Sequence, residues 1–251
     1  MNSNKVIKHF ATRATTFSKN GWADNEAILQ TILNGIMIFC PSTEMLLDFG
    51  AGTGVVSKYL IDKIPNIMKI TALDISSDML SQIQDERIQC VVSSVDNTPF
   101  HNSQFDLIVS RQCLHYVHDL TKTLAEAKRI LKNHGIFILT QFVPLEDDTK
   151  QYWKKLMEIR QPLRVHHYSE NDWIKCFIKN GFSLLSTERF TIVNSVARWT
   201  NQYTMISNEK KQKYISKLLN APDSYKLKYN IAIEGTDIIG KTYGVTLVFE
   251  S

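Results

Sequence analysis

Short apolar runs alternate with segments of helical periodicity along the chain up to Phe142. The apolar runs predict strands at MLLDF, KITALD, IQCVV, FDLIVS and GIFILTQFV. Between them, apolar residues recur at every third or fourth position. This spacing predicts helices over residues 23–39 with Asp24 as the N-cap, from Thr53 to about Ile64, in SSDMLSQIQ and in DLTKTLAEAKRILKN. Apolar strands that alternate with helices predict a parallel sheet covered on both faces.

The pattern changes after Pro144. Helical periodicity returns in DDTKQYWKKLMEI, in SENDWIKCFIKNG between a Ser169 cap and a Gly181 stop, and twice more after Asn194. FSLLSTERFTIV predicts a strand, and residues 225–250 predict paired strands around Gly235 and Gly240. Since no linker separates these segments, we expect a single domain, 1–251. Residues 143–181 and 194–225 are then cap insertions over the carboxyl edge of the sheet, where open α/β sheets bind ligands.

Composition narrows the function classes. The chain has 251 residues and a net charge of +4, too small for the basic footprint of a nucleic-acid-binding protein. No apolar run is long enough to span a membrane, and the four cysteines form no C-x-x-C pair. These features predict a cytoplasmic protein with reduced thiols and no metal site. The acid-free first 23 residues resemble a transit peptide, but VIKHFATRATTF also fits a short amphipathic helix, which we favour.

The segment EMLLDFGAGTGVV places Asp48 directly before a glycine-rich turn. A turn that holds the diphosphate of a dinucleotide has the spacing G-x-G-x-x-G. Gly50 and Gly52 fit this spacing, but Val55 stands at the third glycine position, and the carboxylate of Asp48 would repel a diphosphate. A cationic ligand without phosphate suits the turn better. S-adenosylmethionine is such a ligand, because it carries an ammonium and a sulfonium group.

LLDFGAGTG also resembles the first motif of class I S-adenosylmethionine-dependent methyltransferases, an acidic residue followed by G-x-G-x-G. The next segments resemble that family's later motifs in order: DISSDML, SSVDNTPF, FDLIVSRQCLHYVHD and LKNHGIFILTQF. The resemblance runs from Glu44 to Phe142, so residues 44–142 are the expected cofactor-binding core. It implies a Rossmann-like α/β fold: a seven-stranded, mostly parallel sheet with helices on both faces and helical cap insertions.

The resemblance also implies which residues contact the cofactor. Asp74 is expected to accept hydrogen bonds from both ribose hydroxyls. Where the family often has an acid facing the adenine amino group, this chain has Ser94, so Ser94 or Asp96 would make that contact. The predicted cofactor-binding set is Asp48, Gly50, Ala51, Gly52, Gly54, Asp74, Ile75, Met79, Ser94, Val95, Asp96 and Arg111.

Among the subfamilies, the chain is most similar to the ubiquinone/menaquinone C-methyltransferases and their small-molecule relatives. This implies methyl transfer to an oxygen or carbon of a small-molecule acceptor in a biosynthetic reaction. HFATRATTFSKNG also resembles the start of malonyl-carrier-protein O-methyltransferases, in which such a segment closes over the cofactor, so residues 1–20 are a predicted lid. The alternative acceptor is therefore an acyl group on an acyl carrier protein. That hypothesis predicts one basic surface formed by Lys210, Lys211, Lys213 and Lys217 with Arg160 and Arg164, the two arginines lying near the pocket mouth.

A third hypothesis keeps the fold but assigns it to binding or to non-methylating chemistry. Nucleic-acid methylation is not supported, because no N-P-P-Y signature is present. His115, after the fourth predicted strand, is the candidate general base or substrate anchor, and its alternative role is only to hold the local loop. His166, His167 and Tyr168 are the predicted acceptor-pocket residues, and with no spaced partner they do not predict a metal site.

Overall fold

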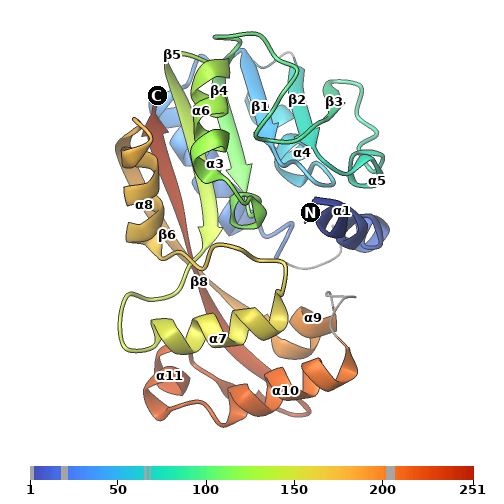
Figure 1. Ribbon diagram of the computed structural model, residues 1–251, viewed down its shortest axis with the longest axis vertical. Helices are drawn as coiled ribbons and strands as arrows, with labels where there is room; N and C mark the ends of the chain where they lie inside the picture. Colours follow the sequence, from blue (N-terminus) through green and yellow to red (C-terminus); the bar gives the residue numbers. More distant parts are fainter. Residues whose placement is uncertain (1–2, 18–21, 65–66, 68, 202–206) are drawn as a thin grey trace.

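The computed structural model describes residues 3–17, 22–64, 67, 69–201 and 207–251. Its centre is an eight-stranded sheet with the order β3-β2-β1-β4-β5-β8-β6, and β7 pairs with β8 (Figure 1). The first five strands are parallel, and β8 runs antiparallel to β5, β6 and β7. The strand bounds are β1 Met45–Phe49, β2 Lys69–Asp74, β3 Ile88–Val92, β4 Phe105–Arg111, β5 Leu131–Phe142, β6 Ser183–Ser195, β7 Ala232–Glu234 and β8 Asp237–Glu250.

Helices cover both faces of the sheet, as the sequence pattern predicts. On one face, α3 (Glu26–Phe39) and α4 (Val55–Ile61) pack through leucine and isoleucine side chains against the strands. On the other face lie α6 (Leu120–Ile130) and α8 (Glu170–Lys179) (Figure 1). Phe177 of α8 packs on Phe137 of β5 and Phe249 of β8, and Trp173 belongs to the same core. Strand residues alternate between the two faces, so each strand contributes to both cores.

A second lobe lies beyond the carboxyl ends of the parallel strands (Figure 1). It contains the helices α7 (Lys150–Arg160), α9 (Val196–Asn201), α10 (Asn208–Leu219) and α11 (Asp223–Lys228). Their apolar side chains, mostly aromatic, form a core of their own around Trp153, Tyr214, Tyr225 and Tyr229. We call this lobe the cap. The predicted insertion 143–181 also contains α8, which lies against the sheet rather than in the cap.

The N-terminal segment lies beside the carboxyl ends of β1 and β2 (Figure 1). It forms α1 (Ser3–Ala11) and the short α2 (Ala14–Phe17), and Phe10 and Phe17 contact each other edge to face. Of the predicted lid, residues 1–2 and 18–20 lie outside the described residues. The helix predicted from VIKHFATRATTF is thus present as two pieces.

The structure corrects three local predictions. Asn25, not Asp24, caps α3, because its side chain accepts a hydrogen bond from the amide of Ile28. Gly240 lies inside β8, while the turn between β7 and β8 is at Gly235, whose φ is +61°. The helix predicted in SSDMLSQIQ is limited to α5 (Ser77–Leu80). The strand predictions in the parallel part of the sheet are confirmed to within a few residues, apart from an earlier start of β5.

Candidate active site

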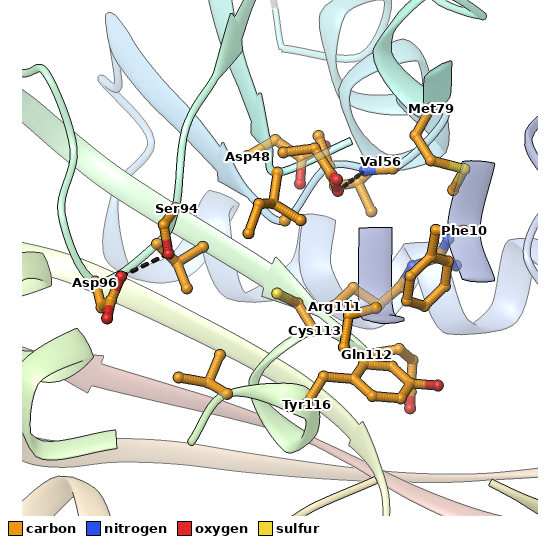
Figure 2. Close-up of a pocket in the computed structure, with 18 of the residues that line it drawn as sticks. Phe10, Asp48, Val56, Met79, Ser94, Asp96, Arg111, Gln112, Cys113 and Tyr116 are labelled. Atoms are coloured by element: carbon orange, nitrogen blue, oxygen red, sulfur yellow. Dashed lines mark hydrogen bonds between the residues drawn. The ribbon is translucent and has the colours of Figure 1, made fainter. Parts of the chain in front are cut away.

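A cavity of about 210 Å³ opens at the carboxyl ends of β1, β2 and β4 (Figure 2). We call it the first cavity. All the residues predicted to bind the cofactor line it except Gly54. The N-terminal segment and the loop after β4 supply the rest of its wall: Val6, Phe10, Phe17, Trp22, Gln112, Cys113, Tyr116, Val117, His118 and Asp119, with Val56 from α4.

The glycine turn after β1 needs its glycines for different reasons. At Gly50 a Cβ atom would lie 2.2 Å from Sγ of Cys113, so no side chain fits, and φ is +85°. Gly52 has a φ of +56°, and its amide donates a hydrogen bond to Oδ2 of Asp74 over 2.9 Å. The turn therefore brings bare backbone to the cavity wall and joins the ends of β1 and β2.

Asp48 is a buried carboxylate at the bottom of this turn, with 1% of its surface exposed. Its Oδ2 accepts hydrogen bonds from the amide and the hydroxyl of Ser57 at 3.2 and 2.7 Å. Burial raises the pKa of Asp48 to about 6, although the Ser57 hydrogen bonds and the charge of Arg111 act in the opposite direction. An ionisable carboxylate with a raised pKa in a cavity wall gains from a cationic ligand.

Asp74 ends β2 and faces the same cavity. Its Oδ1 accepts from the amide of Ser76 and its Oδ2 from the amide of Gly52, both at 2.9 Å. Burial raises the pKa of Asp74 and these backbone hydrogen bonds oppose the rise. Each carboxylate oxygen keeps a further lone pair, so Asp74 can still accept two hydroxyl donors.

Ser94 and Asp96 lie together at the opposite wall (Figure 2). The hydroxyl of Ser94 donates to Oδ1 of Asp96 over 2.5 Å, and Lys122 forms an ion pair with Oδ2 at 3.3 Å. The Ser94 hydrogen bond is the main cause of the lowered pKa of Asp96. Asp96 is thus the charged acceptor of this wall, and Ser94 positions it. Ile75, Met79 and Val95 add apolar surface.

Arg111, at the end of β4, brings a positive charge to the first cavity. Its Nη1 donates to the backbone oxygen of Ala23 over 2.6 Å, and its guanidinium lies 5.6 Å from the ring centre of Trp22. Burial lowers the pKa of Arg111 to about 10, against the attraction of Asp48. The residue therefore fixes the chain before α3 and balances the charge of Asp48.

A second, smaller cavity of about 30 Å³ adjoins the first. The two share five wall residues: Phe10, Phe17, Trp22, Gln112 and Tyr116. The rest of its wall comes from α7 and the segment after it, the N-terminal segment, the loop after β4, and strands β5 and β8. It comprises Arg13, His115, Phe142, Trp153, Met157, Arg160, Gln161, Arg164 and Thr242.

His115 lies in the 3-10 helix Leu114–Tyr116 and lines the second cavity, not the first. Only 1% of its surface is exposed, and its Nδ1 donates to Oε1 of Gln141 over 2.8 Å. Because an amide oxygen can only accept, Nδ1 carries the proton and Nε2 has a free lone pair. Nε2 is buried and has no hydrogen-bond partner among the described residues. Burial, and then the charge of Arg164, lowers the pKa of His115 well below 6.5, so the imidazole is neutral.

The backbone oxygen of His115 also connects the loop after β4 to the segment between α7 and α8. It accepts hydrogen bonds from the amides of Val165 and His166 at 2.9 and 3.2 Å. His166 in turn donates from Nε2 to the backbone oxygen of Val117 over 2.7 Å. The loop-holding role and the cavity-lining role of His115 are therefore both present, one on the backbone and one on the side chain.

The structure does not bring the predicted acceptor residues His166, His167 and Tyr168 into either cavity. His167 lies edge-on to Trp153, and Tyr168 packs against Trp173. Arg160 and Arg164, which the carrier-protein hypothesis places near the pocket mouth, do line the second cavity, whereas Trp153, Met157 and Gln161 were not predicted for it. A signal existed for Arg160, because it continues the buried stripe of α7 formed by Trp153, Leu156 and Met157.

The predicted basic surface is also corrected. Arg160 and Arg164 are buried, with 3% and 6% exposure, whereas Lys210 and Lys213 are exposed on α10. Arg160 and Arg164 line the second cavity, whereas Lys210 and Lys213 lie on the exposed face of α10. Among the described residues no cluster of three His, Cys, Asp or Glu side chains could hold a metal ion. None of the described helices has the length and hydrophobicity that crossing a bilayer requires.

Comparison with known proteins agrees with this geometry. A methyltransferase domain family matches residues 47–139. An uncharacterized methyltransferase of Bacillus subtilis, YcgJ, is 23% identical over 88% of this chain and 91% of its own. The crystal structure of YcgJ superposes with a TM-score of 0.79 at 19% identity, over 90% of this chain and 99% of that one. The fold, the glycine turn and the matched segment all resemble those of class I methyltransferases.

Two further relatives match the core. The demethylmenaquinone methyltransferase of Thermotoga maritima is 33% identical over 45% of this chain and 49% of its own. The malonyl-[acyl-carrier protein] O-methyltransferase of Geobacter sulfurreducens is 30% identical over 48% of this chain and 46% of its own. This chain thus matches only about half the length of each. Residues 47–139 are thus a methyltransferase domain, and the matches to these two relatives leave its acceptor open.

Proposed function

We propose that the protein transfers the methyl group of S-adenosylmethionine to an oxygen or carbon of a small-molecule acceptor. The cofactor occupies the first cavity, and the acceptor lies where this cavity meets the second. The observation that carries the proposal is the adjacency of two unlike cavities. One is acidic and lined by glycine backbone, the other is basic and aromatic, and five residues belong to both walls.

The first cavity fits the cofactor chemically. Asp48 is available to its ammonium group, Asp74 to its ribose hydroxyls and Asp96 to its adenine amino group. Ile75, Met79 and Val95 offer the apolar surface that an adenine ring needs. When bound there, S-adenosylmethionine supplies a methyl group activated by a sulfonium. The fold and the family imply the use of this cofactor, and the residue assignments are part of the proposal.

The protein's own part is alignment, exclusion of water and proton removal. Holding the acceptor in line with the methyl group supplies much of the rate in a direct displacement. The aromatic side chains of Phe10, Trp22 and Tyr116 exclude water from the junction of the cavities. A hydroxyl acceptor loses its proton as its oxygen gains the methyl group, and Nε2 of the neutral His115 receives that proton.

An acyl group on a carrier protein is the second candidate acceptor. It is favoured by the malonyl-[acyl-carrier protein] O-methyltransferase match and by the exposed Lys210 and Lys213 on α10, which could contact an acidic carrier. The buried positions of Arg160 and Arg164 remove the other half of that predicted surface. A use of the fold for binding alone is disfavoured by the intact glycine turn with Asp48 and Asp74.

One experiment separates these candidates. Purified protein is incubated with S-adenosylmethionine and, in parallel, with quinols, phenols and an acylated carrier protein, and S-adenosylhomocysteine is quantified by mass spectrometry. We expect turnover with a small molecule. Turnover with the carrier protein alone would favour the second candidate, and cofactor binding without turnover on any acceptor would favour the binding role.

A further inference from the structure

Two side chains in the wall of the second cavity each carry an unpaired polar atom, and the two atoms are of opposite kind. One is Nε2 of Gln112, an N–H donor, and the other is Nε2 of His115, whose lone pair is an acceptor. Both atoms are buried, and neither has a hydrogen-bond partner in the part of the chain that the structure describes. Since a buried polar atom without a partner destabilises the fold, a ligand that bonds to both atoms gains from each.

Gln112 lies at the junction of the two cavities. It follows Arg111, the last residue of β4, and it is one of the five residues that line both cavities (Figure 2). Its φ is +54°, an unfavourable conformation for a residue with a Cβ atom. Its backbone amide donates to the oxygen of Thr140 in β5 over 3.0 Å. The sheet therefore holds Gln112 in a position that a regular strand end would not give it.

The size of the second cavity limits the group that can occupy it. Its volume of about 30 Å³ admits roughly two water-sized groups. Because Gln112 and His115 both line so small a volume, one polar group of the acceptor is sufficient to contact both. That group must accept a hydrogen bond from Gln112 and donate one to His115. A hydroxyl does both with a single oxygen.

We propose that the methyl acceptor is a hydroxyl compound, and that Gln112 donates a hydrogen bond to the same oxygen whose proton His115 removes. The inference rests on the proposed function, because it specifies the reacting atom of that site. Gln112 also lines the first cavity, so the oxygen that it holds lies on the side of the methyl group. A hydroxyl oxygen has two lone pairs, so one can accept from Gln112 while the other attacks the methyl carbon. A neutral amine has only one lone pair, and a carbon nucleophile places no hydrogen-bond acceptor at the reacting position.

The two residues have different tasks in this reaction. The O–H bond breaks and its proton passes to Nε2 of His115. The oxygen bonds to the methyl carbon as the carbon–sulfur bond of the sulfonium breaks, so the positive charge ends on the imidazolium. The hydrogen bond from Gln112 stabilises the negative charge that develops on the oxygen, and it directs the remaining lone pair to the methyl group.

The test measures binding to the full-length protein with and without S-adenosylhomocysteine, followed by fluorine NMR. The probes are 4-fluorophenol and 4-fluorotoluene, which have nearly the same shape. We expect the phenol to bind at least about tenfold more tightly, because the toluene leaves both buried atoms unpaired. Equal binding of the two probes, or no binding of the phenol, would overturn the proposal. This comparison is made on the unaltered protein, so it remains decisive if a variant does not fold.

Variants locate the effect at Gln112. Gln112→Met keeps the length of the side chain and removes the donor. It should weaken binding of 4-fluorophenol about tenfold and leave 4-fluorotoluene unchanged. Gln112→Glu, which replaces the donor with an acceptor, should weaken the phenol at least as much. Gln151→Met, at an exposed position of α7, is the matched control and should change neither. Unchanged phenol binding in Gln112→Met would show that Gln112 does not hold the hydroxyl.

Calorimetry with S-adenosylhomocysteine reports on the proposed function separately. If this ligand binds and the preference for the phenol is absent, the hydroxyl acceptor and the role of Gln112 are wrong. If it does not bind, but the phenol is preferred and the preference is lost in Gln112→Met, the hydroxyl site stands and the proposed function fails.

Discussion

Gln141 accepts a hydrogen bond from Nδ1 of His115 over 2.8 Å, and this bond determines which nitrogen of the imidazole faces the second cavity. Gln141 is fully buried in β5, so the orientation is built into the sheet and not into the loop. The arrangement is the one that a general base requires: a fixed ring with its lone pair toward the acceptor.

The first prediction concerns this pair. His115→Ala should lower turnover by about 10²–10⁴-fold if Nε2 takes the acceptor proton. Gln141→Leu keeps the imidazole but removes the hydrogen bond that fixes its tautomer. This variant should lower turnover less than His115→Ala does. Affinity for S-adenosylhomocysteine should not change in either variant, because neither residue lines the first cavity. Near-normal turnover in His115→Ala would show that alignment alone drives the reaction.

The pH dependence of turnover tests the same residue. The sequence alone predicts a rate that rises through an imidazole pKa near 6.5. The structure changes that expectation, since burial lowers the pKa of His115 well below this value. The base form is then already present at pH 6, and the rate of the saturated enzyme should show no histidine inflection between pH 6 and 8. A clear inflection near 6.5 would mean that another group is titrating or that His115 is hydrated.

Asp74→Ala should weaken binding of S-adenosylmethionine by about 1.5–3 kcal/mol, because charge-assisted hydrogen bonds to the ribose are lost. Isothermal calorimetry measures the change, and Asp78→Ala, an exposed position nearby, is the control. Unchanged affinity in Asp74→Ala would remove Asp74 from the cofactor site. Nicotinamide dinucleotides should not bind, because Asp48 lies where their diphosphate would be.

Asp48→Asn should stabilise the protein without ligand. Its pKa is raised in the folded state to about 6 from 3.8, so the folded protein binds more protons than the unfolded chain between these pH values. Stability therefore falls as pH rises through this window. Above pH 6 the full cost of burying the ionised carboxylate of Asp48 is present. Removing the Asp48 carboxylate should raise the free energy of unfolding by at most about 3 kcal/mol at pH 7.5, since a shift of one pKa unit corresponds to 1.36 kcal/mol. Thermal unfolding at pH 7.5 and pH 4 measures the difference, which should vanish at the lower pH.

The last prediction concerns the N-terminal segment. Val6, Phe10 and Phe17 line the first cavity, so deleting residues 1–20 should open it and reduce both cofactor affinity and turnover. The sheet and its two cores should remain folded, because the strands and the helices that cover them begin later in the chain. Normal turnover of the truncated protein, measured beside the full chain, would show that the segment is not a lid.

The sequence predicts the parallel half of the sheet well because two regular signals coincide there. Each strand contains a short apolar run, and a glycine or polar residue marks the end of several of them: Gly50 follows β1, and Asp74 is the last residue of β2. The second cavity is less readable for a physical reason. Its residues come from α7, the turn at Arg13, the loop after β4 and β8, and only the folded chain brings them together. Arg160 is informative as an arginine on a buried stripe, but a single sequence does not show which side chains from distant segments it lies beside.

The two longest strands continue past the end of their neighbours. β5 pairs with β8 only from Ile136 to Phe142, whereas β6 pairs with β8 along its whole length, from Ser183 to Ser195. The cap is therefore built on the free ends of strands that are anchored in the central sheet, not on a flexible connection. Heat or denaturant should consequently melt cap and sheet in one cooperative transition. The cavity that receives the acceptor is therefore held rigid by the paired strands β5, β8 and β6. A change of acceptor specificity then comes from substitutions of side chains in the cap, and not from a change in a hinge.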